Sequence, residues 1–206
     1  MPLASSAVIE DIRAFREDQL ASLAFIYCDF SASEKSDQRG ILLSLLFQLG
    51  EQSDAYSAIL SKFYDAHHRR GSRPASDKEL LDCLKEMLNC PGQAPVHITI
   101  DALDECPTTN DLPTPRENAL ELVEELVNLR IRHLRICVTS RPEPDIASAL
   151  GSLAFRSVSL EGESGQDKDI AEYIESFVKT DKVMRKWKDT DKQLVIEVLL
   201  KNADGM

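Results

Sequence analysis

The chain has 206 residues, 43% of them hydrophobic, so it is long and apolar enough to bury the core of one domain, or of one domain and the start of another. Its formal net charge of -11, from 35 acidic and 24 basic residues, argues against nucleic acid and anionic lipid as partners, because both are bound by positive surfaces. No apolar run reaches the roughly 20 residues that cross a bilayer, and the first residues lack the plan of a signal peptide, so we expect a cytoplasmic protein without membrane contact.

Strand-like and helix-like segments alternate along the chain, which predicts an α/β fold with a parallel sheet and helices on its faces. We expect about four strands, because four short segments are rich in apolar, β-branched or aromatic residues and have turn residues nearby. In chain order these segments are residues 23–30, 96–101, 134–139 and 155–160.

Between the strands, apolar residues recur with the helical period. Residues 41–49 are apolar nearly all round, so we expect this helix to be deeply buried. Ser76 and Glu79 form a capping-box pattern at the start of another helix. After residue 160 the pattern is helical only. We therefore predict an α/β domain over residues 1–162 and the beginning of a helical subdomain over residues 163–206.

The cysteines are five in number and lack the paired spacing of metal ligands: Cys28, Cys83, Cys90, Cys106 and Cys137. Cys28 and Cys137 lie inside apolar, strand-like runs. This distribution is typical of buried, reduced thiols in a cytosolic protein rather than of a disulfide framework.

The most informative segment is an apolar strand that ends at Asp101 and is followed by Asp104 and Glu105. A carboxylate at the carboxyl end of a parallel strand faces the crevice where ligands bind, so Asp101 is a candidate ligand of Mg²⁺. Asp104 or Glu105 is then placed to orient and polarise an attacking water. The alternative is that these acids only cap the next turn. We favour the functional interpretation because the whole pattern, and not a single acid, recurs in phosphate-hydrolysing sites.

The next strand ends at Thr139 and is followed by Arg141, so both residues are expected at the same edge of the sheet. An arginine there can bind a γ-phosphate through two parallel hydrogen bonds, which makes Thr139 and Arg141 candidate nucleotide-binding residues. Alternatively, Arg141 forms a structural ion pair with Asp101 or Glu105.

The sequence contains no Gly-x-x-x-x-Gly-Lys-Ser/Thr loop, whose backbone amides and lysine hold the phosphates in enzymes with such an acidic strand end. The chain therefore has the pattern of a nucleotide switch without its phosphate loop.

At these residues the chain resembles the NACHT-type signal-transduction NTPases of the STAND class, in particular the large fungal group whose nucleotide-binding domain precedes repeats. The resemblance runs along almost the whole chain. Its carriers, in order, are the segments at residues 24–30, 45–49, 100–107, 139–145 and 203–206.

The resemblance implies an incomplete P-loop NTPase-like sheet that binds Mg²⁺ with ATP or GTP. Asp101 takes the Walker B magnesium role, Asp104 and Glu105 the hydrolytic positions, and Arg141 the sensor position. Family members carry the phosphate-loop strand between the strands that correspond to residues 134–139 and 155–160. Without it, we expect these two strands either to pair directly or to leave a gap that invites a donated strand.

Three functions follow as expectations. The first is a nucleotide-dependent switch core, which we expect to bind and hydrolyse nucleotide inefficiently by itself because positioning by the phosphate loop carries most of phosphoryl transfer. The second is a non-catalytic interaction or scaffold module, with protein partners. The third is a piece of a longer product or a degenerate copy that keeps the fold.

Overall fold

The computed structural model describes residues 2–29, 37–69, 73–108, 113–159 and 164–202. Two compact units form, Met1–Ala154 and Phe155–Met206, and each is considered by itself. The domain boundary expected after residue 162 stays a prediction. Over the described residues, no helix is both long and apolar enough to cross a membrane.

The first unit is built on a three-stranded parallel sheet with the strand order β1-β2-β3, which confirms the expected α/β fold. The strands are β1 (Ser22–Tyr27), β2 (Val96–Asp101) and β3 (Leu134–Val138). Tyr27 lies opposite Asp101, and Ile100 lies opposite Val138. The carboxyl ends of all three strands therefore meet at one edge of the sheet.

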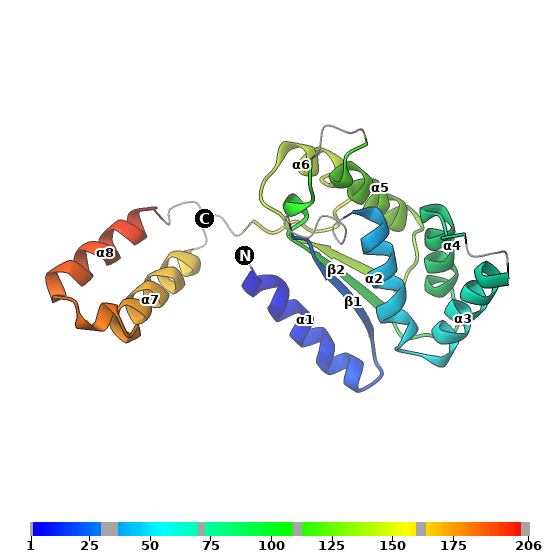
Figure 1. The fold of residues 1–206 in the computed structure, drawn as a ribbon, viewed down its shortest axis with the longest axis horizontal. Helices are drawn as coiled ribbons and strands as arrows, with labels where there is room; N and C mark the ends of the chain where they lie inside the picture. Colours follow the sequence, from blue (N-terminus) through cyan, green and yellow to red (C-terminus); the bar gives the residue numbers. More distant parts are fainter. Residues whose placement is uncertain (1, 30–36, 70–72, 109–112, 160–163, 203–206) are drawn as a thin grey trace. The chain divides into compact units, whose positions relative to one another are not determined.

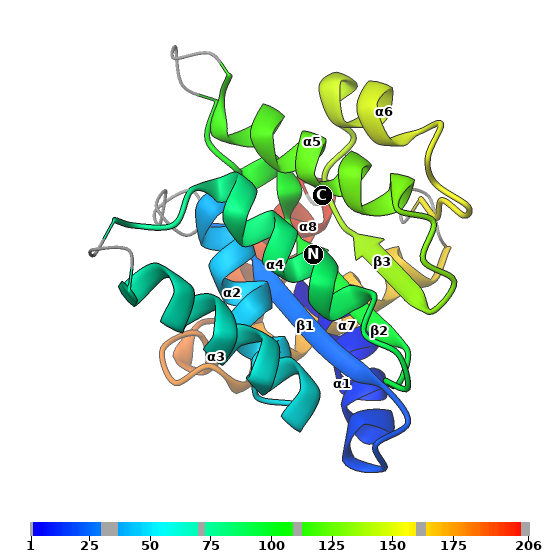
Figure 2. The same cartoon turned by 90° about the vertical axis from the view of Figure 1, so that its right-hand side faces the viewer.

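Helices cover both faces of this sheet (Figure 1). The elements of the first unit are α1 (Pro2–Glu17), α2 (Gln38–Gly50), α3 (Asp54–Arg69), α4 (Asp77–Leu88), α5 (Pro115–Asn128) and α6 (Pro144–Leu150). Helix α1 lies against β1 and β2 on one face, while α2, α4 and α5 share the core on the other. Helix α3 packs on α2 and α4, at the periphery in Figure 2.

The core lies between the sheet and the helices α2, α4 and α5. Ile98 and Ile100 of β2 are fully buried there, together with the apolar faces of the helices. The predicted capping box of Ser76 and Glu79 is present at the start of α4, and a second one begins α5. Each box satisfies amides that the first turn of a helix leaves unpaired, which fixes where these helices begin.

Two glutamine side chains, Gln48 of α2 and Gln52 just after the end of this helix, protect the outer edge of β1. Gln48 accepts a hydrogen bond from the Phe25 amide (3.0 Å) and donates one to the Phe25 carbonyl (2.7 Å). Gln52 makes the same pair of bonds with Leu23, at 2.9 and 2.6 Å. Because an exposed strand edge is a template for aggregation, these amides act in place of a neighbouring strand.

The prediction of a fourth strand at residues 155–160 is wrong. Residues 155–159 are not in a strand, and Phe155 and Val158 are exposed; Leu160 lies outside the described residues. A strand is stable only when its backbone groups are paired, and among the described residues β3 has a strand partner on one side alone. The alternative of direct pairing between this segment and β3 is therefore wrong as well.

The apolar composition of α2 predicted that this helix is deeply buried. The helix is buried in large part, but not all round. Ile41, Leu42 and Leu45 have no exposed area, whereas 46% of Leu43 and 62% of Phe47 is exposed. The sheet, α3, α4 and α5 contact α2 and leave one stripe uncovered.

The second unit is helical, as the pattern predicted. It contains α7 (Ser164–Thr180), the short 3-10 helix η2 (Met184–Lys186) and α8 (Asp189–Asn202). Helix α7 contacts both η2 and α8. Val178 of α7 is fully buried and Ile196 of α8 nearly so, which leaves only a small core.

Candidate functional site

The chain turns sharply after β2. Asp101 ends the strand with 5% of its surface exposed, and Ala102 adopts the left-handed conformation (φ 54°, ψ 50°). A non-glycine residue in this region is strained, so the surrounding bonds must hold it. The short 3-10 helix η1 (Leu103–Glu105) follows, anchored by the fully buried Leu103.

Thr139, the residue after β3, holds this turn against the end of the sheet. Its hydroxyl group donates to Oδ1 of Asp101 and accepts from the Ala102 amide at 3.0 Å. Its carbonyl accepts from the Leu103 amide at 2.9 Å, and its own amide donates to Ile100 at 3.0 Å. The structure thus brings Asp101 and Thr139, two of the five predicted site residues, into direct contact.

Asp104 and Arg141 form a second contact across the same edge. The Arg141 amide donates to Oδ1 of Asp104 at 3.0 Å, and the Arg141 Nε atom lies 3.5 Å from Oδ2. The Asp104 side chain is 8% exposed and that of Arg141 is 69% exposed. The alternative that Arg141 pairs with Asp101 or Glu105 is wrong, because the intervening turn presents Asp104 to it instead.

Glu105, the third predicted acid, is half-buried. Its amide donates to the Ala102 carbonyl at 2.8 Å, which closes η1. Its carboxylate has no hydrogen-bonding or ionic partner in the described part of the chain. The carboxylate is therefore not used to hold the turn together.

Arg116 also shapes the site, and the sequence patterns gave no indication of it. From the first turn of α5 its guanidinium group donates to the carbonyls of Asp104 and Cys106, the latter at 3.3 Å, and lies 3.4 Å from Asp145 of α6. The capping box of Thr114 sets the start of α5 and so the position of Arg116. That box is visible in the sequence, but the distant carbonyls are not.

The negative charge of Asp101 also acts on the thiol of Cys137 in β3. Burial raises the pKa of the Cys137 thiol above its ordinary value, and the charge of Asp101 raises it further.

The carboxylates at this edge of the sheet suit Mg²⁺ only if water and substrate phosphates supply the other ligands. In the described ranges no three His, Cys, Asp or Glu side chains are gathered closely enough to hold a metal ion by themselves. Mg²⁺ usually keeps several waters and is bound through one or two carboxylates and substrate phosphates. Asp101 fits that scheme, because Oδ1 is bonded to Thr139 and no described residue donates to Oδ2.

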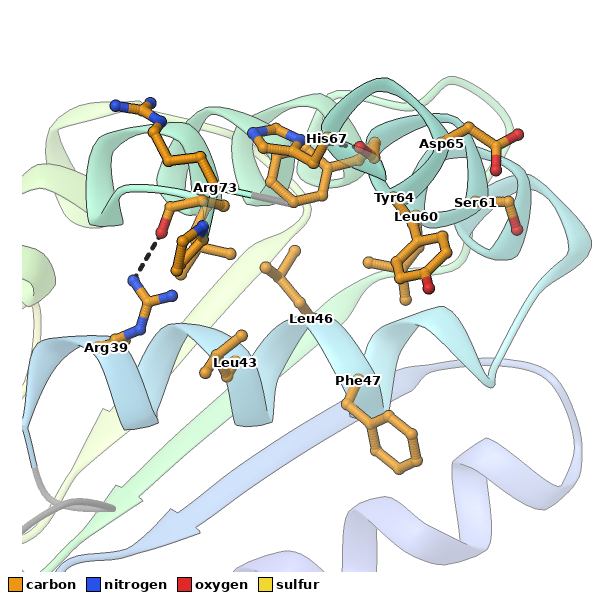
Figure 3. A pocket seen from close by; sticks show the side chains of 14 residues that line it. Arg39, Leu43, Leu46, Phe47, Leu60, Ser61, Tyr64, Asp65, His67 and Arg73 are labelled. Atoms are coloured by element: carbon orange, nitrogen blue, oxygen red, sulfur yellow. Dashed lines mark hydrogen bonds between the residues drawn. The ribbon is translucent and has the colours of Figure 1, made fainter. Parts of the chain in front are cut away.

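Two cavities lie elsewhere in the first unit. One, of about 890 Å³, lies between α2 and α3, where Leu46 and Leu60 point toward each other in Figure 3. Another, of about 700 Å³, lies between α5 and α6 and includes Asp145, the partner of Arg116. Neither is lined by any of the five predicted site residues.

Comparison with known proteins assigns the chain to a family. No curated protein and no solved structure matched the chain significantly. A family model described as Nephrocystin 3, N-terminal, matches residues 3–141, which is more than half of the chain and includes β1, β2, β3 and all the residues of the candidate site. This family is associated with NACHT-containing proteins. The chain therefore belongs to the Nephrocystin 3, N-terminal family.

Proposed function

We propose that this chain is part of a NACHT-type nucleotide-dependent switch domain, and that the carboxyl edge of its sheet faces Mg²⁺ and the phosphates of ATP or GTP. Asp101 is the carboxylate that holds the ion, directly or through water. Asp104 and Glu105 are the acids that orient water, and Arg141 contacts phosphate.

The observation that carries this proposal is the pair of contacts across the ends of β2 and β3. Thr139 fixes one oxygen of Asp101, which orients the other, and Asp104 fixes the backbone and Nε of Arg141. No described residue binds the other two nitrogens of the exposed guanidinium group, which suit a bidentate bond to phosphate. A site whose residues are oriented before the ligand arrives suits phosphoryl transfer, which depends mainly on positioning and charge.

The direction of α1 supports the same assignment. A short turn joins α1 to β1, and α1 packs along β1 and β2, so it runs antiparallel to the strands and begins near their carboxyl ends (Figure 1). The amino end of a helix carries unpaired amides and a partial positive charge, both of which favour phosphate. Phosphate groups at this edge would face α1 as well as Arg141.

We expect the affinity to be low, because the 206 residues contain no phosphate-loop motif. Binding of Mg²⁺ with a fluorescent ATP or GTP analogue should be in the millimolar range, should require Mg²⁺, and should be lost in Asp101→Asn. Asp82→Asn, on the exposed side of α4, is the matched control because it removes the same charge away from the site. Tight, micromolar binding would contradict the expected weakness, and binding that Asp101→Asn leaves unchanged would contradict the assignment of the site.

A non-catalytic interaction module is the second candidate function, and the cleft between α2 and α3 favours it. Apolar side chains line most of this cleft, and 46% of Leu43 and 64% of Tyr64 is exposed there. Apolar side chains gathered at a surface are one means of contact with another protein, which is what this second candidate uses. This candidate predicts that the chain self-associates in sedimentation, and that Leu43→Asp abolishes the association while Asp101→Asn does not. A chain that stays monomeric would contradict it.

A further inference from the structure

Two buried thiols are in contact next to the candidate site. Cys28 follows β1 and Cys106 follows η1, 78 residues apart in sequence, yet their Sγ atoms are 3.4 Å apart. Cys28 is 4% exposed and Cys106 is 1% exposed. Both are free thiols in this structure.

The backbone holds both residues in place. The Cys28 amide donates to the Asp101 carbonyl at 2.9 Å, which extends the pairing of β1 with β2 by one residue. The Cys106 amide donates to Leu103 at 3.1 Å, and its carbonyl accepts from Arg116. These bonds hold the two backbones at the distance from which the Sγ atoms meet.

The two thiols also differ in acidity. The hydrogen bond with Cys28 lowers the pKa of Cys106, an effect that burial opposes and the nearby Arg116 guanidinium reinforces. The hydrogen bond with Cys106 and burial raise the pKa of Cys28. The thiolate is the form of a cysteine that reacts with oxidants, and Cys106 is the one of the two whose backbone carbonyl binds the Arg116 guanidinium group, so a positive charge lies beside it.

We propose that Cys28 and Cys106 are an oxidation site, at which hydrogen peroxide converts the two thiols into a reversible intramolecular disulfide. The Cys106 thiolate attacks one peroxide oxygen, the O–O bond breaks, and the leaving hydroxide takes up a proton to give water. Cys106 is then a sulfenic acid. Cys28 loses its proton and its sulfur attacks Cys106, the S–O bond breaks, and a second water leaves. The two thiols together lose two electrons, which the peroxide gains.

The bond would tie the end of β1 to the end of η1 on either side of Asp101. It would also close a loop of 78 residues in the unfolded chain, which disfavours unfolding. The oxidised protein should therefore be more resistant to urea than the reduced one. This inference concerns the thiols alone and stands independently of nucleotide binding.

The test is a peptide map of the purified chain after treatment with hydrogen peroxide and alkylation, without reduction. The expected result is a linked peptide pair that contains Cys28 and Cys106, is released by dithiothreitol, and is accompanied by a higher urea midpoint. Cys28→Ser and Cys106→Ser should each abolish the link. Cys83→Ser and Cys137→Ser, which remove a buried and a half-buried thiol elsewhere, should leave it unchanged.

Because burial slows the access of any oxidant, the chain is also equilibrated in a glutathione redox buffer, where the result depends on equilibrium and not on rate. Formation of the same disulfide there supports the proposal. Links between other cysteines, irreversible sulfinic acid, or glutathione adducts in place of the Cys28–Cys106 bond would overturn it.

Discussion

Asp104 binds Arg141 through the backbone as well as the side chain: the Arg141 amide donates to Oδ1 at 3.0 Å, and Nε lies 3.5 Å from Oδ2. The carboxylate is almost buried, whereas most of the guanidinium group is in solvent. Asp104 therefore fixes the backbone of Arg141, and within the described ranges no residue binds the two terminal nitrogens of its guanidinium group. In the proposed function, these outer nitrogens are the ones that contact phosphate.

Alanine at Arg141 and at Arg116 should then have different effects on stability. Arg141 is exposed, so Arg141→Ala should cost less than about 1 kcal/mol, the range of surface ion pairs. Arg116 is 14% exposed and bonds two carbonyls that would be left unpaired, so Arg116→Ala should cost about 1 to 3 kcal/mol. Urea unfolding measures both, and equal costs would show that Arg141 is as structural as Arg116.

Removal of the Thr139 hydroxyl should destabilise the turn after β2. Thr139→Val keeps the shape but leaves a buried carboxylate, Asp101, without its donor, and we expect a loss of about 1 to 3 kcal/mol in the free energy of unfolding. Thr108→Val, at an exposed position, is the control and should change stability little. If the two variants are equally stable, the Thr139–Asp101 bond does not hold the site.

The glutamine-covered edge of β1 predicts an effect on solubility. Gln48→Ala removes both bonds to Phe25 and exposes an amide and a carbonyl at the edge of the sheet. Light scattering on gentle heating should show earlier aggregation than in the original chain, because an unpaired edge can pair with another molecule. Gln93→Ala, in the loop before β2, should behave like the original chain, and aggregation at the same temperature in both variants would refute the protective role.

His97 of β2 predicts how stability depends on pH. Burial, and next the positive charge of Arg135, hold the pKa of His97 below its ordinary value of 6.5. The unfolded chain therefore takes up a proton more readily than the folded one, so stability falls as the pH drops through 6.5 and levels off below the folded pKa.

Urea unfolding at about pH 7.5 and about pH 5.5 tests this sign in the original chain and in His97→Gln. The loss of stability on acidification should be smaller in the variant, which has no imidazole at this position to titrate. A loss of the same size in both would assign the pH dependence to other groups.

The sequence predicted what depends on local pattern. The parallel sheet, the position of Asp101 at the end of β2 and the capping box of Ser76 all follow from periodicity or short motifs, and the structure has them. The proximity of Thr139 to Asp101 followed too, because the ends of adjacent parallel strands meet.

Long-range partners were beyond the reach of such patterns. Residues 155–159 have a strand-like composition, but a strand also needs a neighbour, and composition does not reveal whether one is present. The carbonyls that Arg116 binds and the strand edge that Gln48 covers depend on the packing of distant segments. For the same reason the alternative in which Arg141 forms a structural ion pair named Asp101 or Glu105, whereas its partner in the structure is Asp104.

The most direct test of the central claim, that Asp101 and its neighbours hold a divalent cation beside phosphate, is NMR with Mn²⁺ in place of Mg²⁺. Manganese prefers the same oxygen ligands, and as a paramagnetic ion it broadens the signals of nearby amides. With nucleotide present, we predict that broadening is centred on the amides of Ala102 and Thr139 and disappears in Asp101→Asn. Broadening centred on other acidic surfaces such as Glu121 of α5, or unchanged in Asp101→Asn, would contradict the assignment.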